Sequence, residues 1–134
     1  MGKLQDFLME QEIGEVQTEV QIAPFPFPFT IRSISEAENK AIRKSCQKIE
    51  FDKKTRQKRV DTDTDLYNSR LVVACCVEPN FKDAALQEKY GVRGAEALID
   101  KILKPGQYTD LLLAVQEING FTDDVNELRD EAKN

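Results

Sequence analysis

The sequence predicts an α+β fold: a mainly helical single domain of about five to six helices with a small antiparallel sheet or hairpin near its N-terminal end. Three observations lead to this prediction. The chain has 134 residues, 40% of them apolar and 32% charged, which suits one soluble domain. Strand-like patterns occur early in the chain, and helical periodicity dominates later. No linker or internal repeat interrupts the pattern, so we assign residues 25–134 to a single domain and residues 1–24 to an extended N-terminal arm, with partial disorder of the arm left open.

An extended segment opens the predicted fold. Residues 13–22 alternate apolar with polar side chains, as a half-buried strand does, with Val16, Val20 and Ile22 on the apolar side. In the next stretch, "PFPFPFTIRSI", each proline holds the preceding residue out of the helical region. Strand geometry then puts four apolar side chains on one face: Phe25, Phe27, Phe29 and Ile31. Because proline donates no backbone hydrogen bond, we expect this segment at a sheet edge or in a polyproline-like arm.

A helix and a hairpin are expected next. The residues Ser35-Glu36-Ala37-Glu38 have the capping-box pattern, so a helix should run from about 36 to 48. Its predicted inner face holds Ala41, Ile42, Cys46 and Ile49. Residues 49–60, "IEFDKKTRQKRV", indicate two short strands around a basic turn.

Alternating aspartates after this hairpin resemble the start of a calcium-binding EF-hand loop, which uses carboxylates at its first, third and fifth positions. The three are Asp61, Asp63 and Asp65. The sixth and twelfth positions of such a loop require glycine and glutamate, but the chain has Leu66 and Val72 there. We therefore interpret the acidic cluster as a helix start, with Asp63 or Thr64 as the N-cap.

The remainder of the chain is predicted to be helical. Apolar residues nearly encircle the stretch from Leu66 to Val77, which should be the central core helix, and Pro79 ends it. A short helix, "DAALQEKY", should follow Asn80 or Asp83 and close at Gly91. Helices over 94–103 and 107–119 are expected on either side of a tight turn at Lys104-Pro105-Gly106. A last, acidic helix is expected to be capped by Thr122.

The residue types limit the chemistry that this protein can perform. It contains no histidine, the commonest general base, and no Gly-rich phosphate loop or paired-carboxylate motif. Its three cysteines, Cys46, Cys75 and Cys76, have neither disulfide-framework nor zinc-site spacing, and we expect buried thiols. We therefore predict a protein that is not an enzyme, with no catalytic residue, metal ligand or cofactor.

The sequence contains no segment with the pattern of a membrane helix or a secretory signal. No apolar run approaches the roughly 20 residues of a spanning helix, and the N-terminal residues lack the apolar segment of a secretory signal. We expect an intracellular, cytoplasmic protein without a membrane partner.

Charge is distributed unevenly along the chain. Residues 40–59 hold nine basic side chains against two acidic ones, whereas residues 110–134 hold seven acidic against two basic. Such a chain can orient on a partner or on a copy of itself. A small nucleic-acid-binding or regulatory protein that uses the basic 53–59 hairpin is the alternative function. The net charge of −5 and the lack of an aromatic platform beside the basic run make nucleic acid the less favoured partner.

Three segments together resemble a known family: "FPFTIRSISEAE", "DTDLYNSRLVVACCVEPNFKDAALQEKYGV" and "GAEALIDKILKPGQYTDLLLAVQEINGF". Their order, and the terminal "EAKN", are similar to the XkdN-like tail assembly chaperones of phages and defective prophages with contractile tails. The resemblance runs from about residue 4 to the last residue, and "PNFKDAALQEKYGV" is among its most specific parts.

The resemblance implies a non-catalytic function in the host cell cytoplasm, carried by residues 25–134 as the chaperone domain. Such chaperones are expected to bind the tape-measure protein, to keep it soluble during assembly of the tail tube, and to be absent from the finished virion. Tail tube subunits, a longer frameshifted form and further copies of the chain remain open as other partners.

The frameshift hypothesis depends on the last three residues, Ala132-Lys133-Asn134. A slippery run A-AAA-AAY would encode them in the zero frame, and such a slip would yield the longer form. A lysine codon AAG, or no overlapping frame downstream, would contradict this hypothesis. A frayed polar helix end is the other interpretation of these residues.

Two sets of side chains are candidates for contacting a protein partner. The first is Phe25, Phe27 and Phe29, which a proline-stiffened segment would present at little ordering cost, although packing on their own domain is the favoured alternative, since large aromatic faces are normally buried. The second is the basic hairpin, with Lys53, Lys54, Arg56, Lys58 and Arg59, which could also pair with the acidic C-terminal helix of a neighbouring subunit.

Overall fold

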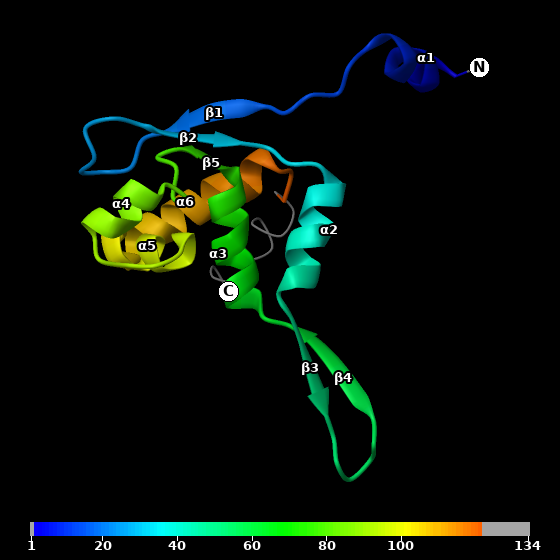
Figure 1. The fold of residues 1–134 in the computed structure, drawn as a ribbon. Helices are drawn as coiled ribbons and strands as arrows, with labels where there is room; N and C mark the ends of the chain where they lie inside the picture. The colour runs from blue at the N-terminus through cyan, green and yellow to red at the C-terminus, as the bar shows by residue number, and fades with distance from the viewer. Residues whose placement is uncertain (1, 122–134) are drawn as a thin grey trace, which may run out of the picture.

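Helix α3 (Thr64–Cys75) lies at the centre of the fold in a computed structural model that describes residues 2–121 (Figure 1). Around it the described chain forms the helices α2 (Glu36–Ser45), α4 (Ala84–Lys89), α5 (Ala95–Ile102) and α6 (Pro105–Ile118). A further helix, α1 (Lys3–Glu10), lies away from this body. Together with two small antiparallel sheets, these helices confirm the predicted α+β, mainly helical fold.

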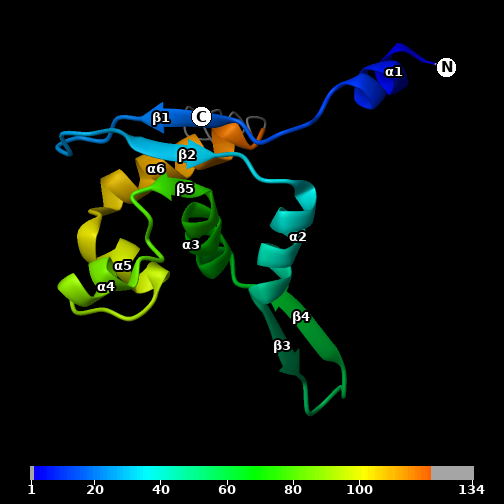
Figure 2. The same cartoon turned by 45° about the horizontal axis from the view of Figure 1, so that its top comes forward.

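The larger sheet has the order β1 (Gln17–Val20), β2 (Phe29–Arg32) and β5 (Cys76–Glu78), with both pairs antiparallel. Figure 2 shows α6 and α3 beneath this sheet. The third strand corrects a prediction, because the chain turns extended at Cys76, where the sequence favoured a continuous helix to Val77. Cys76 pairs with Ile31 of β2. The backbone groups of β5 thus find hydrogen-bond partners in the sheet, whereas the last carbonyls of a helix have none within the helix.

The second sheet is a two-stranded hairpin of β3 (Gln47–Phe51) and β4 (Lys58–Thr62). It confirms the two strands predicted around a basic turn. The hairpin extends from the end of α2 away from the body (Figures 1 and 2). All of its residues except Asp61 are exposed.

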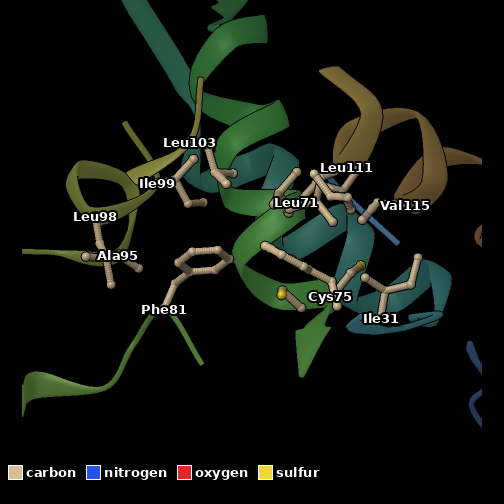
Figure 3. Packing of buried hydrophobic residues seen from close by; sticks show 14 residues of the cluster. Ile31, Leu71, Cys75, Phe81, Ala95, Leu98, Ile99, Leu103, Leu111 and Val115 are labelled. Atoms are coloured by element: carbon tan, nitrogen blue, oxygen red, sulfur yellow. The ribbon is translucent and has the colours of Figure 1, made fainter. Parts of the chain in front are cut away.

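The core forms between the larger sheet, α3, α5 and α6, as Figure 3 shows for ten labelled side chains. Ile31 from β2, Leu71 and Cys75 from α3, and Leu111 and Val115 from α6 are all fully buried. Phe81, in the loop before α4, fills the space beside α5. The predicted apolar face of 94–103 is confirmed in α5, where Ala95, Leu98 and Ile99 are buried.

Local capping rules correctly placed three helix starts. The Ser35 hydroxyl accepts from the Glu38 amide at 3.2 Å, and Asp63 accepts from the Leu66 amide at 3.2 Å. Asp83 accepts from the Ala85 and Leu86 amides at 2.9 and 3.4 Å. The predicted turn at Lys104-Pro105-Gly106 is wrong in part, because Pro105 is the first residue of α6. At this position proline's lack of a backbone N–H costs no helical hydrogen bond.

The inner face of α2 also differs from the prediction. Ala41 is exposed, and Ile49 lies in the hairpin with 71% of its surface exposed. Asn39 is instead the buried residue of α2. Its side-chain Oδ1 accepts a hydrogen bond from the Tyr67 hydroxyl, and its Nδ2 donates to Glu36 Oε1 at 3.2 Å. Both polar atoms of the side chain therefore have partners.

The N-terminal arm is not extended throughout, since α1 occupies residues Lys3–Glu10. Residues 12–16 lead from α1 to β1 without regular structure. The acidic helix predicted after Thr122, and the Ala132-Lys133-Asn134 end, lie outside the described residues. Over the described range, no helix has the length and apolarity that crossing a membrane requires.

Candidate functional site

An open groove, here called the aromatic groove, lies between the β1–β2 loop and α4. Its volume is about 240 Å³. The lining residues are Phe25, Pro26, Phe27, Pro28, Phe29, Glu78, Pro79, Leu86, Tyr90 and Ile102. This volume is below the roughly 300–1,000 Å³ of pockets that enclose small molecules. The groove therefore suits one or two protruding side chains of a protein partner.

The three phenylalanines predicted as a contact surface all line this groove, but they differ in burial. Phe29 belongs to β2 and is buried. Phe25 packs edge-on against Phe29, with ring centroids 5.2 Å apart. Phe27 has 77% of its surface exposed whereas Phe29 and Ile31 are buried, so the predicted single face of Phe25, Phe27, Phe29 and Ile31 is wrong. The chain bends between Phe25 and Phe29, and the strand geometry assumed from the prolines does not extend over this loop.

Polar contacts hold the phenylalanine loop in place. Gln107, in the first turn of α6, donates from Nε2 to the Ala23 carbonyl at 2.8 Å. Gln21 donates from Nε2 to the Phe25 carbonyl at 2.9 Å, and the Phe25 amide donates to the Ile22 carbonyl at 3.0 Å. These bonds hold the loop backbone at residues 22–25, directly before Phe27, which reduces the backbone ordering that binding through Phe27 requires.

The opposite wall comes from α4 and the residues that follow it. Tyr90 is the C-cap of α4, and its ring is exposed beside the groove. Gln87 fixes this wall, since its Nε2 donates to the Phe81 carbonyl at 2.9 Å and its Oε1 accepts from the Gly94 amide at 3.1 Å. Phe27 and Tyr90 thus offer two exposed rings, a residue type enriched in protein interfaces.

The basic side chains predicted as the second contact set lie on the hairpin, away from the groove. Lys53, Lys54 and Arg56 occupy the turn, and Lys58 and Arg59 begin β4. Arg59 is paired with Asp61, with 2.9 Å between Nε and Oδ2. Lys58 stands opposite the exposed Phe51 in the strand register. The structure therefore presents two separate candidate surfaces.

The buried thiols are placed for packing. All three cysteines are free and buried, as predicted. Burial raises the pKa of Cys76 to about 12, with smaller contributions from Glu78 and Cys75, and burial likewise raises the pKa of Cys75. Both thiols remain protonated at neutral pH and are poor nucleophiles. Within residues 2–121, no group of three or more His, Cys, Asp or Glu side chains is placed to hold a metal ion.

Sequence reasoning missed most of the groove's second wall. Leu86, Tyr90 and Ile102 join the phenylalanines only through the packing of α4 and α5. The available signal was Tyr90, a large aromatic residue directly before the helix-ending Gly91.

Comparison with known proteins gives a consistent assignment. Residues 4–133 match the family model described as "Phage XkdN-like tail assembly chaperone protein, TAC". The chain is 32% identical over 75 residues to the phage-like element PBSX protein XkdN of Bacillus subtilis (strain 168), covering 55% of this chain and 51% of that protein. It is 35% identical over 75 residues to the uncharacterized protein YqbN of the same strain, covering 55% and 50%. The chain thus spans about half the length of the curated relatives it matches.

A solved structure supports the fold assignment. The crystal structure of the protein YqbN superposes with a TM-score of 0.71, covering 90% of this chain and 98% of that one. At 23% identity this similarity concerns the fold alone.

Proposed function

Since the chain belongs to the phage XkdN-like tail assembly chaperones, we propose that its client is the tape-measure protein, which it keeps soluble during assembly of the tail tube. The chaperone acts without catalysis in the host cell cytoplasm, serves a contractile tail, and is absent from the finished virion. The observation that carries this proposal is the aromatic groove, which Phe27 and Tyr90 line with exposed rings.

The physical reason is the chemistry of a long helical client. A helix whose apolar face has no partner exposes a continuous hydrophobic stripe, and such stripes aggregate. A groove that accepts apolar side chains along one helix face covers part of that stripe. The aromatic groove accepts one or two such side chains, so several chaperone copies would bind along one tape-measure chain. Each chaperone copy would bind the client weakly, and tube subunits could displace the copies from the client as they polymerise.

Co-expression with the tape-measure protein tests this proposal. The wild-type chain should increase the soluble fraction of the client and co-purify with it by size exclusion. Phe27→Ser should lose most of this effect, because it removes the most exposed ring of the groove without altering the core. The matched control is Phe51→Ser, the same change on the exposed hairpin, which should retain the effect. Equal client solubility with and without the wild-type chain would contradict the proposal.

The frameshift prediction belongs to the same proposal. A longer frameshifted product that begins with this chain would carry the same groove. The codons for Ala132-Lys133-Asn134 should read as the slippery run, and mass spectrometry of the expressed native gene should detect both lengths. A single product from the intact slippery run would contradict it.

A second candidate is binding of single-stranded nucleic acid at the hairpin. The observation that favours it is the exposed Phe51 beside Lys58, since an aromatic ring within a basic stretch can stack on a base. Fluorescence anisotropy with a labelled oligonucleotide tests this function. Affinity should fall steeply with salt and be lost in Phe51→Ser, and no binding at low salt would exclude it.

A further inference from the structure

Two elements project from the body and expose apolar side chains to solvent. Helix α1 and the β3–β4 hairpin lie at different ends of the molecule in both orientations (Figures 1 and 2). Within the described part of the chain, neither α1 nor either hairpin strand contains a buried residue. Both elements nevertheless carry large apolar side chains, which normally require a covering surface when they gather in a patch.

Each element places three large apolar side chains on one face. In α1, Leu4, Phe7 and Leu8 are exposed at the spacing that forms a single helical stripe. In the hairpin, Ile49 stands directly opposite Val60, and directly paired residues share a face of the sheet. Phe51 lies two residues after Ile49 and therefore on that face. All three hairpin residues are exposed.

Neither element has much stability of its own. Helix α1 has eight residues and no side-chain N-cap hydrogen bond, and isolated helices shorter than about 12 residues are marginal in water. A two-stranded hairpin without a covering element is also marginal. Packing against another apolar surface would stabilise either one.

The charges of the two elements are complementary. Residues 3–16 hold four acidic side chains and one basic one, a balance of −3. Residues 47–62 hold six basic and three acidic side chains, a balance of +3. Opposite charges on two surfaces steer their association and disfavour the pairing of like with like.

We propose that the N-terminal segment, residues 3–16, of one copy docks on the β3–β4 hairpin of a second copy. The apolar stripe of α1 covers the Ile49, Phe51 and Val60 face, and the acidic residues of the segment lie near the basic turn. The hairpin is long enough to receive α1, since eight helical residues span about 12 Å and five strand residues about 17 Å. Because the two surfaces differ, the contact is head-to-tail and generates a ring or a string of chaperones.

A mixing experiment tests this contact, because each surface can be removed separately. The first variant carries Leu4→Ser, Phe7→Ser and Leu8→Ser and keeps its hairpin. The second carries Ile49→Thr, Phe51→Thr and Val60→Thr and keeps α1, with threonine preserving strand propensity. Sedimentation velocity should show concentration-dependent association of the wild type. Each variant alone should be monomeric, and an equimolar mixture should form a one-to-one dimer through the remaining intact pair of surfaces.

The control variant is Met9→Ser, which changes an exposed α1 residue away from the stripe and should still associate. Circular dichroism confirms that the body of each variant is folded. A wild type that stays monomeric up to hundreds of micromolar would overturn the proposal. So would a mixture that stays monomeric, or a first variant that still associates alone. If the hairpin variant instead loses binding to the client or to an oligonucleotide while the wild type is monomeric, that ligand occupies the hairpin and the proposal fails.

Discussion

The two sheets of this protein are built from similar short strands but have opposite surroundings. In β2, Ile31 is fully buried between the sheet and its helices, whereas in β3 Ile49 is exposed. The two sheets differ in their covering helices: α3 and α6 cover the larger sheet, whereas no described element covers the hairpin. The pattern of a strand's apolar residues thus predicts the strand but does not show whether the same chain covers it.

Thiol reactivity should show the largest contrast between the two regions. With its pKa raised from 9.0 to about 12, Cys76 has about a thousandfold less thiolate at pH 8 than an ordinary thiol. We expect an Ile49→Cys variant to react with a maleimide or Ellman's reagent in one fast phase, while the three native cysteines react only after unfolding. Fast reaction of all native thiols in the folded protein would show that the body opens readily.

Truncation of the matched isoleucines should separate the two sheets by stability. Ile31→Ala removes fully buried atoms and should lower the free energy of unfolding by about 2–5 kcal/mol. Ile49→Ala should change it by no more than about 0.5 kcal/mol in the monomer. Urea unfolding followed by circular dichroism measures both. Equal losses would mean that the hairpin packs on the body in solution.

The polar link between α2 and α3 should have an intermediate effect. Asn39→Ala leaves the Tyr67 hydroxyl without its partner in a partly buried site, which should cost about 1–3 kcal/mol. Lys40→Ala, at the exposed neighbouring position, is the control and should be nearly neutral. Urea unfolding measures both variants. An unfolding midpoint of Asn39→Ala equal to that of the wild type would indicate that water replaces this contact.

Loss of the α2 cap should be smaller. Ser35→Ala removes the acceptor for the Glu38 amide and should destabilise the protein by about 0.5–2 kcal/mol. Ser35→Asn keeps a capping side chain and should restore most of the loss. Thermal unfolding compares both variants with the wild type. A midpoint temperature of Ser35→Ala equal to that of the wild type would show that this cap contributes nothing.

The smallest effect should be the pH dependence from Asp63. Hydrogen bonding from the Leu66 amide and then from Lys48 lowers the pKa of this carboxylate below its usual 3.8. Its contribution is therefore present above pH 3.8 and is lost as the pH falls through the lower pKa of the folded state. Asp63→Asn keeps the cap and should flatten the acid limb of the stability profile. An acid limb as steep as that of the wild type would assign the dependence to other carboxylates.

The features predicted from sequence are those that depend on neighbouring residues. The caps at Ser35, Asp63 and Asp83 were found because their partners lie two or three residues away. Strand β5 was missed because its extended backbone is stabilised by β2, far earlier in the chain. Asn39 was missed because its burial depends on Tyr67, which lies 28 residues away.

The candidate site shows the same limit. The sequence grouped Phe25, Phe27 and Phe29 as a candidate contact set, and all three line one groove in the structure. The sequence did not distinguish the buried Phe29 from the exposed Phe27, because Phe29 pairs in β2 while the chain bends at residues 26–27, outside the strand. Tyr90 joins the site only through the placement of α4.

Hydrogen–deuterium exchange with and without the tape-measure protein would test the central claim most directly. If the aromatic groove binds the client, peptides covering residues 25–29 and 86–90 should gain protection in the complex, while the hairpin peptides over 47–62 exchange as before at monomeric concentrations. Protection confined to residues 47–62, with none at the groove, would contradict the claim and place the client on the hairpin.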